Sequence, residues 1–289
     1  MNLRTMTLAL LSMVACANLT SCSNDDDNNS TNDNGNTLVN PGNVFSGTRL
    51  QKYNGGTLKY DASGLLTDLV GDENNYYKLS YDGATVKITG KTVEDGESLT
   101  TSYTLTIGAD GFVKHLEGVD GKQQDVCDYT YDADGYLTKI VDHCSPAPGY
   151  ESTDGGTFAM YTLLKWEDGK LIATYSSSQE FSDINTPGID VQTFEYTNEE
   201  TPNPIENKGG VMTFDDTFGM NAYGLCVIFP YYGGMMGKGW KYLPLKSIPN
   251  GHTPDDYAWT LDENGYTTSL VISNKDYSGV VDNYTFGWK

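Results

Sequence analysis

Residues 131–140 read YDADGYLTKI, and this stretch has the form of a β-hairpin turn. The carboxylate of Asp132 can accept a hydrogen bond from a backbone N–H two residues later, which favours the first position of a type I turn. Gly135 stands where the chain must adopt a positive φ, a conformation that costs glycine little. A type I turn followed by such a glycine is a common hairpin loop with a β-bulge. We therefore expect the chain to reverse between Asp132 and Gly135.

This loop also predicts the register of the two strands that flank it. The expected cross-strand pairs are Tyr131 with Leu137, Tyr129 with Lys139, and Cys127 with Val141. One face of the hairpin is then mostly apolar and the other mostly polar, which is typical of an antiparallel sheet with one wet side. The D-x-D-G sequence also begins calcium loops, but an EF-hand needs further ligands as far as a twelfth-position glutamate.

Approximate copies of the turn occur at residues 60–66, 81–83, 107–113, 166–169 and 261–266. Each period holds two strands, and such supersecondary repeats need neighbours to cover their apolar faces. We expect a meander of strands at 57–60, 65–70, 76–81, 85–89, 102–107, 112–116, 126–131, 136–141, 157–166, 170–176, 191–196, 257–261, 266–272 and 280–288.

The regular pattern stops between residues 197 and 253. Its Gly-rich run at 231–238 disfavours a long helix, since glycine costs roughly 1 kcal/mol per helical position against alanine. We expect a short irregular or helical insertion around 215–245 that packs against the sheet as a plug or lid. Four aromatic residues in it are the candidate ligand-binding residues: Tyr231, Tyr232, Trp240 and Tyr242. We expect Trp240 to be buried, and Tyr231 and Tyr232 to be displayed.

Residues 1–21 are predicted to be a lipoprotein signal peptide, with Arg4 before an apolar region at 6–17. The sequence Leu19-Thr20-Ser21-Cys22 has the form of a bacterial lipobox, so Cys22 is the predicted lipidation site. Acyl chains on Cys22 would anchor the chain in outer-membrane lipid. Cys16 is the rival anchor, and an ordinary secretory signal is the alternative interpretation.

Residues 22–43 are predicted to be a disordered acidic tether, because they contain almost nothing that can be buried. Acidic residues directly after the anchor resemble a surface-export signal, which indicates the outward-facing side of the outer membrane. A periplasm-facing lipoprotein with a solvated linker is the alternative. Residues 44–289 then form one β-domain, a length that single all-β domains often reach.

The chain carries 18 basic and 39 acidic residues, for a net charge of −21. Removal of residues 1–21 removes only Arg4, so the mature form carries 17 − 39, or −22. Such a charge disfavours nucleic-acid partners.

The three cysteines beyond the signal peptide and anchor are Cys127, Cys144 and Cys226, and their spacing matches no metal motif. The expected register does not place Cys127 opposite Cys144, although an oxidising compartment permits disulfides. His143 and Cys144 are adjacent, so a strand would point them to opposite faces and they cannot act as a nucleophile–base pair. We therefore predict no catalytic residue, no metal and no cofactor.

The turns resemble the YD-type repeats of large bacterial surface proteins. The central segment is more similar to a family of gut-commensal lipoproteins that carry a domain of unknown function with a porin-like fold. The residues that carry this resemblance are Asn207-Lys208-Gly209, Phe214-Asp215-Asp216-Thr217-Phe218-Gly219, Tyr232-Gly233-Gly234-Met235-Met236-Gly237-Lys238 and Leu243-Pro244.

The resemblance implies an all-β fold, an antiparallel meander curled into a porin-like open barrel. A membrane-spanning barrel is the alternative, but it needs strands of about 9–11 residues and an outward apolar band. The family implies no catalytic residues. We expect a non-catalytic surface module that binds a glycan or a protein; the alternative is a surface glycoside hydrolase with a carboxylate pair. The oligomeric state does not follow from the sequence.

Overall fold

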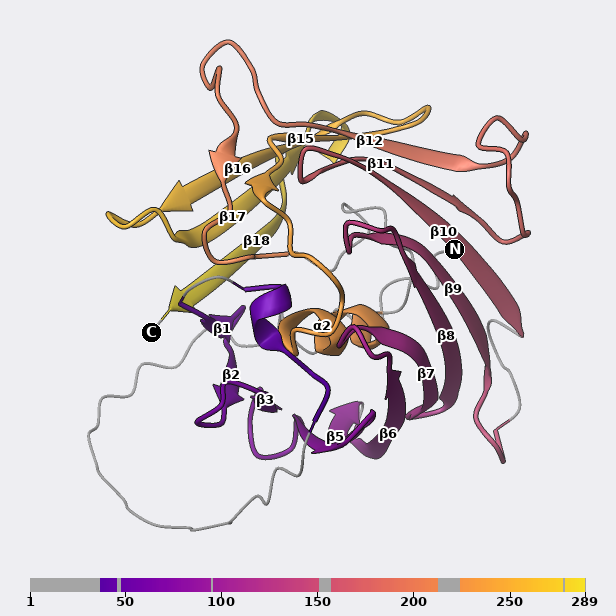
Figure 1. The fold of residues 1–289 in the computed structure, drawn as a ribbon. Coiled ribbons are helices and arrows are strands. Elements are labelled where there is room, and N and C mark those ends of the chain that lie inside the picture. Colours follow the sequence, from indigo (N-terminus) through magenta and orange to yellow (C-terminus); the bar gives the residue numbers. More distant parts are fainter. Residues whose placement is uncertain are drawn as a thin grey trace.

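A computed structural model describes residues 37–45, 48–94, 96–150, 157–212, 224–277 and 279–288. Sixteen strands form a closed antiparallel barrel, drawn as a ring in Figure 1. They are β1 (Leu50–Tyr53), β2 (Gly56–Tyr60), β3 (Leu66–Val70), β4 (Tyr76–Asp82), β5 (Thr85–Glu94), β6 (Glu97–Ile107), β7 (Val113–Asp120), β8 (Gln123–Tyr131), β9 (Leu137–Pro146), β10 (Phe158–Glu167), β11 (Lys170–Ser177), β12 (Asp190–Glu195), β15 (Lys246–Pro249), β16 (Asp255–Leu261), β17 (Thr267–Asn274) and β18 (Gly279–Trp288).

Consecutive strands are neighbours around the ring, apart from β12, which pairs with β15. The skipped strands β13 (Ile205–Glu206) and β14 (Tyr242–Leu243) form a separate two-stranded sheet. In the described ranges the helical elements are η1 (Pro41–Asn43), α2 (Gly224–Tyr232) and η3 (Lys275–Tyr277). The predicted all-β, porin-like fold class is confirmed. Pairing of β1 with β18 closes the barrel completely, where we expected it to stay open.

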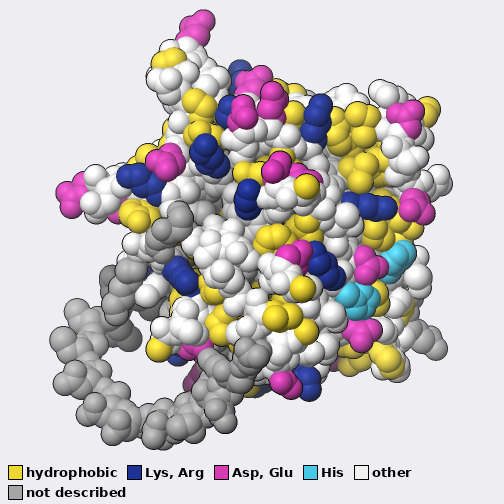
Figure 2. All heavy atoms as spheres, in the orientation of Figure 1, with side chains coloured by type: hydrophobic (Ala, Val, Ile, Leu, Met, Phe, Trp, Pro, Cys, Tyr) yellow, Lys and Arg dark blue, Asp and Glu magenta, His cyan; other side chains and the backbone are white. Residues whose placement is uncertain are grey.

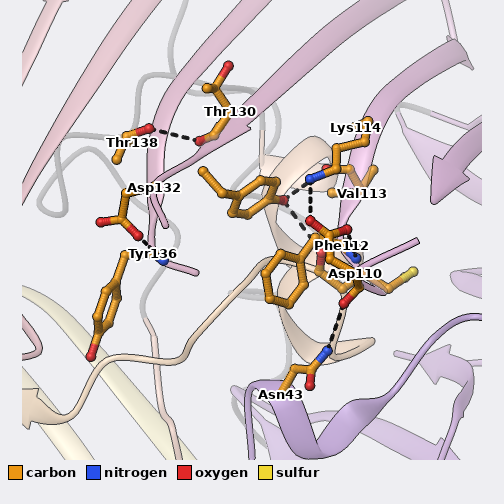
Figure 3. A network of polar contacts seen from close by, with 11 residues as sticks. Asn43, Asp110, Phe112, Val113, Lys114, Thr130, Asp132, Tyr136 and Thr138 are labelled. Atoms are coloured by element: carbon orange, nitrogen blue, oxygen red, sulfur yellow. Dashed lines mark hydrogen bonds and ion pairs between the residues drawn. The ribbon is translucent and has the colours of Figure 1, made fainter. Parts of the chain in front are cut away.

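The hairpin predicted at residues 131–140 is confirmed. Asp132 Oδ1 accepts a hydrogen bond from the backbone N–H of Tyr136 at 2.9 Å (Figure 3). It accepts a second from the N–H of Asp134 at 3.0 Å. Gly135 has a φ of 87°, and its N–H donates to the Asp132 carbonyl at 3.1 Å. The local chemistry of this one aspartate and one glycine therefore builds the turn.

The strand register after the turn differs from the prediction beyond its first pair. Tyr131 faces Leu137 as expected, but a bulge follows, and Thr130 then pairs with Lys139. The Thr138 hydroxyl donates to the Thr130 carbonyl at 3.1 Å within this bulge (Figure 3). The corrected pairs are Tyr129 with Ile140 and Cys127 with Asp142, so the expected Tyr129–Lys139 and Cys127–Val141 pairs are wrong. One extra residue turns every later side chain of β9 to the other face.

The same register shift recurs where other hairpins leave the turn end of the barrel. It occurs beside Tyr60, Ile107, Trp166 and Leu261. In β3, β7, β9 and β17, two partly buried residues separate the first two inward residues, as in Leu66 and Leu69. The repeat unit is therefore a turn together with its bulge.

The barrel encloses a packed core. Helix α2 lies within the ring of strands (Figure 1), and its residues Cys226, Phe229 and Tyr232 are buried. Gly234 follows with a φ of 75°, which no longer fits a helix, so the helix is short, as the glycine-rich sequence predicts. Among the described residues, no helix has both the length and the apolar character needed to cross a membrane.

The side chains that face away from this core are mostly polar on strands β4 to β6. The outward residues of β4 include Lys78, Ser80 and Asp82, which are exposed. Those of β6 include Thr100, Ser102 and Thr106, also exposed. The alternation thus buries apolar residues in the barrel and presents hydroxyls and charges outside.

Candidate functional site

Two segments cover the turn end of the barrel, and we call them together the cap: residues 37–45 and the described parts of residues 205–245. Their contacts with the turns are hydrogen bonds from Leu38 N to Gly83 O (3.1 Å), Asn43 Nδ2 to Asp110 O (3.3 Å, Figure 3), Lys208 Nζ to Asn264 O (2.7 Å), Lys238 N to Gly135 O (2.8 Å) and Lys241 N to Gly169 O (3.1 Å). Residues 37–43, assigned above to the tether, include buried Val39 and Pro41. The cap therefore uses the turns as its docking points.

Most of the aromatic residues near this end have a structural role. An aromatic side chain near the end of one strand donates to a carbonyl at the start of the strand before it. These bonds join Tyr81 to Leu66 (2.7 Å), Tyr131 to Val113 (2.9 Å), Trp166 to Leu137 (2.6 Å), Tyr196 to Leu171 (2.8 Å) and Trp288 to Thr267 (2.6 Å). Tyrosine and tryptophan suit this position because an apolar body carries a polar tip.

Three half-buried rings at the edge of the cap form a surface that we call the aromatic platform: Tyr136, Trp166 and Tyr242. Tyr136 and Trp166 are stacked, with ring centroids 4.9 Å apart and planes 27° apart. Trp166 also contacts Trp240 beneath it, at 6.2 Å between centroids. The platform therefore lies on a buried aromatic base that holds its rings in place.

Lysines surround these rings. Lys238 Nζ lies 5.3 Å from the centroid of Tyr136, and Lys170 and Lys241 Nζ lie 5.5 and 5.1 Å from that of Tyr242. A hydrogen bond with the Tyr242 hydroxyl raises the pKa of Lys241, and the nearby Asp168 carboxylate adds to the effect. In a chain with a net charge of −21, this is a local group of cations beside half-buried rings.

The structure places the four predicted ligand-binding residues differently. Trp240 is buried, 5 % exposed, as expected. The expectation that Tyr231 and Tyr232 are displayed is wrong, because they are 2 % and 1 % exposed at the end of α2 inside the barrel. The Tyr232 hydroxyl donates to the Met212 carbonyl at 2.9 Å. Tyr242 lies at the rim and belongs to the platform.

Sequence reasoning missed the other platform residues, Tyr136 and Trp166, and the lysines around them. Tyr136 directly precedes the inward-facing Leu137, so alternation places it on the outer face of its hairpin, which is a signal that a large ring stays partly outside. Lys238 follows Gly237 in the Gly-rich run, where the positive φ of 77° turns the chain over the Gly135 carbonyl. The sequence carries no signal that shows where the cap docks on the turns, and that docking brings these residues together.

A second group of reactive side chains lies inside the barrel, and we call it the thiol–carboxylate cluster: Asp125, Cys127, Asp142, Cys144 and Cys226. All five are at most 2 % exposed. The bulge in β9 brings Asp142 and Cys144 to the inner face, beside Cys127 and Asp125 of β8. The three cysteines are free, so the disulfide left open above is not formed in this structure.

Hydrogen bonds connect the cluster. The Cys127 and Cys144 thiols donate to Asp142 Oδ1, with Sγ–O distances of 3.1 and 3.6 Å. Burial raises the pKa of the Cys127 thiol to about 12. The pKa of Cys226 is raised by its hydrogen bond with Cys127 and by burial. The thiols are thus protonated at neutral pH in the absence of a bound ion.

Comparison with known proteins shows to which family the chain belongs. Residues 58–269 match the family described as a domain of unknown function (DUF4595) with porin-like fold. The chain belongs to this family. No curated protein matches the chain significantly.

Two solved structures are similar to this porin-like domain in fold. A porin-like protein from Bacteroides uniformis is 16 % identical with a TM-score of 0.52, over 81 % of this chain and 90 % of its own. A porin-like protein from Bacteroides vulgatus is 14 % identical with a TM-score of 0.55, over 84 % of this chain and 99 % of its own. At these identities the likeness concerns the fold alone.

The central residues quoted in the sequence analysis fasten the cap of this porin-like domain. Asn207 accepts a hydrogen bond from Val211 N at 2.9 Å and donates one to Val211 O at 2.8 Å. Gly209 lies against the ring of Trp288, where a Cβ atom would approach the ring to 2.1 Å. Phe214 to Gly219 and the predicted lipidation site Cys22 lie outside the described residues.

Proposed function

We propose that this porin-like domain is a lipid-anchored, non-catalytic binding protein on the outward face of the outer membrane, and that its aromatic platform binds glycans that carry acidic groups. Stacking on Tyr136, Trp166 and Tyr242 would hold sugar rings, because aromatic faces contact apolar ring faces well. Lys170, Lys238 and Lys241 would pair with carboxylate or sulfate groups. The observation that carries the proposal is the Tyr136–Trp166 stack, with Lys238 over Tyr136 and Lys241 over Tyr242.

The core of the barrel supports binding in preference to conduction. A porin has a polar, water-filled lumen and an apolar outer band. Here buried Phe229, Tyr231 and Tyr232 lie within the strands, and β4 to β6 present hydroxyls and charges outside. On these three strands the arrangement is the reverse of a spanning barrel, and we propose attachment through acyl chains on Cys22.

The charges around the aromatic platform also favour an acidic ligand there. The net charge of −21 repels anions from most of the surface. On the face drawn in Figure 2, basic side chains lie among hydrophobic ones as well as among acidic ones. An anion that reaches the platform meets three lysines, and binding should weaken as salt screens their charge.

The hydrolase alternative gains no support from Asp125 and Asp142, the two carboxylates that are buried among the described residues. Asp125 and Asp142 both contact Cys144, but each is 1 % exposed. A sugar cannot reach either group without opening the barrel.

Binding of the mature chain to an array of neutral, carboxylated and sulfated glycans tests the proposal. We expect acidic glycans to bind, and Tyr242→Ala and Lys238→Ala each to weaken binding. The matched control is Tyr76→Ala, because Tyr76 also lies under a lysine, Lys78 at 5.8 Å, but on the barrel wall. If no glycan binds, or if the Tyr242→Ala variant binds acidic glycans with the same affinity as wild type, the platform is not the binding site.

A further inference from the structure

The thiol–carboxylate cluster gathers five potential metal ligands from three elements. Asp125 and Cys127 come from β8, Asp142 and Cys144 from β9, and Cys226 from α2. The ligand atoms of Cys127, Asp142 and Cys226 all lie within 4.8 Å of one another, and so do those of Asp125, Asp142 and Cys144. Asp142 belongs to both groups and therefore stands at the centre of the cluster.

The distances between these atoms resemble those between ligands of one ion. In tetrahedral zinc sites, Zn–S is about 2.3 Å and Zn–O about 2.0 Å, which separates neighbouring S and O ligands by about 3.5 Å. Asp142 Oδ1 lies 3.1 Å from Cys127 Sγ and 3.6 Å from Cys144 Sγ. Cys127, Asp142 and Cys226 thus need only small movements to surround a cation, whereas Cys144 belongs to the other group of ligand atoms and must turn toward Cys127 to complete the set.

The chemistry of the cluster fits a ligand set better than a packing role. Among the described residues, the hydrogen bonds to the Asp125 carboxylate come from neutral groups: Tyr103 OH (2.5 Å), Gln123 Nε2 (2.6 Å) and Cys144 Sγ (3.1 Å). Well-packed apolar residues often stabilise a core more than buried charges do. A bound cation offsets such charge, because it is the largest local charge in its site.

We propose that the cluster is a structural site for a thiophilic divalent cation, Zn²⁺, with Cys127, Asp142, Cys226 and Cys144 as ligands. Thiolates select zinc over harder cations such as Mg²⁺ and Ca²⁺. Asp125, held by Tyr103 and Gln123, orients Cys144 through their hydrogen bond. The ion would join α2 to the barrel wall at a closed site, without room for a substrate.

Oxidation is the competing fate of these thiols. Cys127 and Cys226 hydrogen-bond to one another, so they are close enough for a disulfide to be considered. A Cys127–Cys226 disulfide would leave Cys144, Asp142 and Asp125 buried without a common role. The metal site accounts for all five residues.

Elemental analysis of the full chain, purified from membranes without chelator, tests the proposal. We expect about one zinc per chain. Replacement of zinc by Co²⁺ should produce a thiolate-to-cobalt charge-transfer band together with the strong visible absorption of a tetrahedral site. Asp142→Asn and Cys127→Ser should lower the zinc content by at least about tenfold. The matched control is Asp120→Asn, because Asp120 accepts a hydrogen bond from Thr101 outside the cluster, and it should keep the metal.

A melting experiment on the wild-type chain covers the case in which these variants fail to fold. A chelator should lower the melting temperature, and added Zn²⁺ should restore it, because an ion that binds only the folded state stabilises it. Zinc-free protein whose melting responds to neither reagent would overturn the proposal. A Cys127–Cys226 disulfide found by mass spectrometry of the unreduced chain would also overturn it.

Discussion

Replacement of Gly135 by valine should lower the free energy of unfolding by about 2–4 kcal/mol. Gly135 has a φ of 87°, and a residue held in such a sparsely populated region costs about 1–3 kcal/mol, with β-branched residues the worst. A Cβ atom at this position would also lie 3.3 Å from Phe112 Cε2, so the side chain must displace that ring. Overpacking of this kind typically costs about 1–3 kcal/mol, and partial relaxation of Phe112 lowers the sum.

Urea denaturation followed by circular dichroism measures the effect. With a slope of about 3 kcal/mol/M, the midpoint should fall by about 1 M. Gly135→Asn should be milder, because asparagine tolerates positive φ. Gly96→Val separates strain from crowding, since Gly96 has a φ of 81° but no atom within 4 Å of an added Cβ. A Gly135→Val midpoint equal to that of wild type would show that the turn does not have this conformation.

Trp240→Ala should cost about 3–5 kcal/mol, read from the same urea curves, because it empties a buried site under the platform; an unchanged midpoint would place Trp240 at the surface. Tyr232→Ala should cost a similar amount by this assay, since Tyr232 is 1 % exposed and its hydroxyl is bonded to Met212, and wild-type stability would contradict its place in the core. Gly209→Leu should detach the cap from Trp288, seen as faster proteolysis within 205–245, while equal digestion rates would argue against that contact. Cys22→Ser should abolish lipid labelling and release the chain from membranes; labelling that persists would assign the anchor to Cys16.

The turns could be read from the sequence because their chemistry is local. Asp132 and Gly135 set the hairpin by themselves, and most of the predicted strands follow from the alternation around such turns. Strict alternation predicted the wrong facing residues after the turn, because it does not include the extra residue of the bulge. The signal was present in the spacing of apolar residues by three, as in Leu137 and Ile140, where alternation requires two.

Features that depend on contacts between residues far apart in the chain could not be predicted from the sequence. The barrel closes through β1 and β18, whose paired residues Leu50 and Trp288 lie at opposite ends of the domain. The short strands β1 and β15 have four residues each, too few for a periodic pattern. The cluster needs both the β9 bulge and the insertion of α2 into the barrel to bring Cys226 to Asp142.

The platform was predicted only through Tyr242. Its other rings belong to hairpins, where a single tyrosine or tryptophan looks like any half-buried strand residue. Lys241 links them to Tyr242, because its backbone docks on Gly169 and its side chain interacts with both Tyr242 and Tyr136. That juxtaposition depends on the cap, whose path has no periodic signal.

A crystal structure of the mature chain with the glycan that binds most tightly on the array would show where the ligand lies. We expect a sugar ring stacked on Tyr242 or Tyr136, with its acidic group between Lys238 and Lys241. A glycan found inside the barrel, or on the outer wall beside Tyr76, would contradict this expectation.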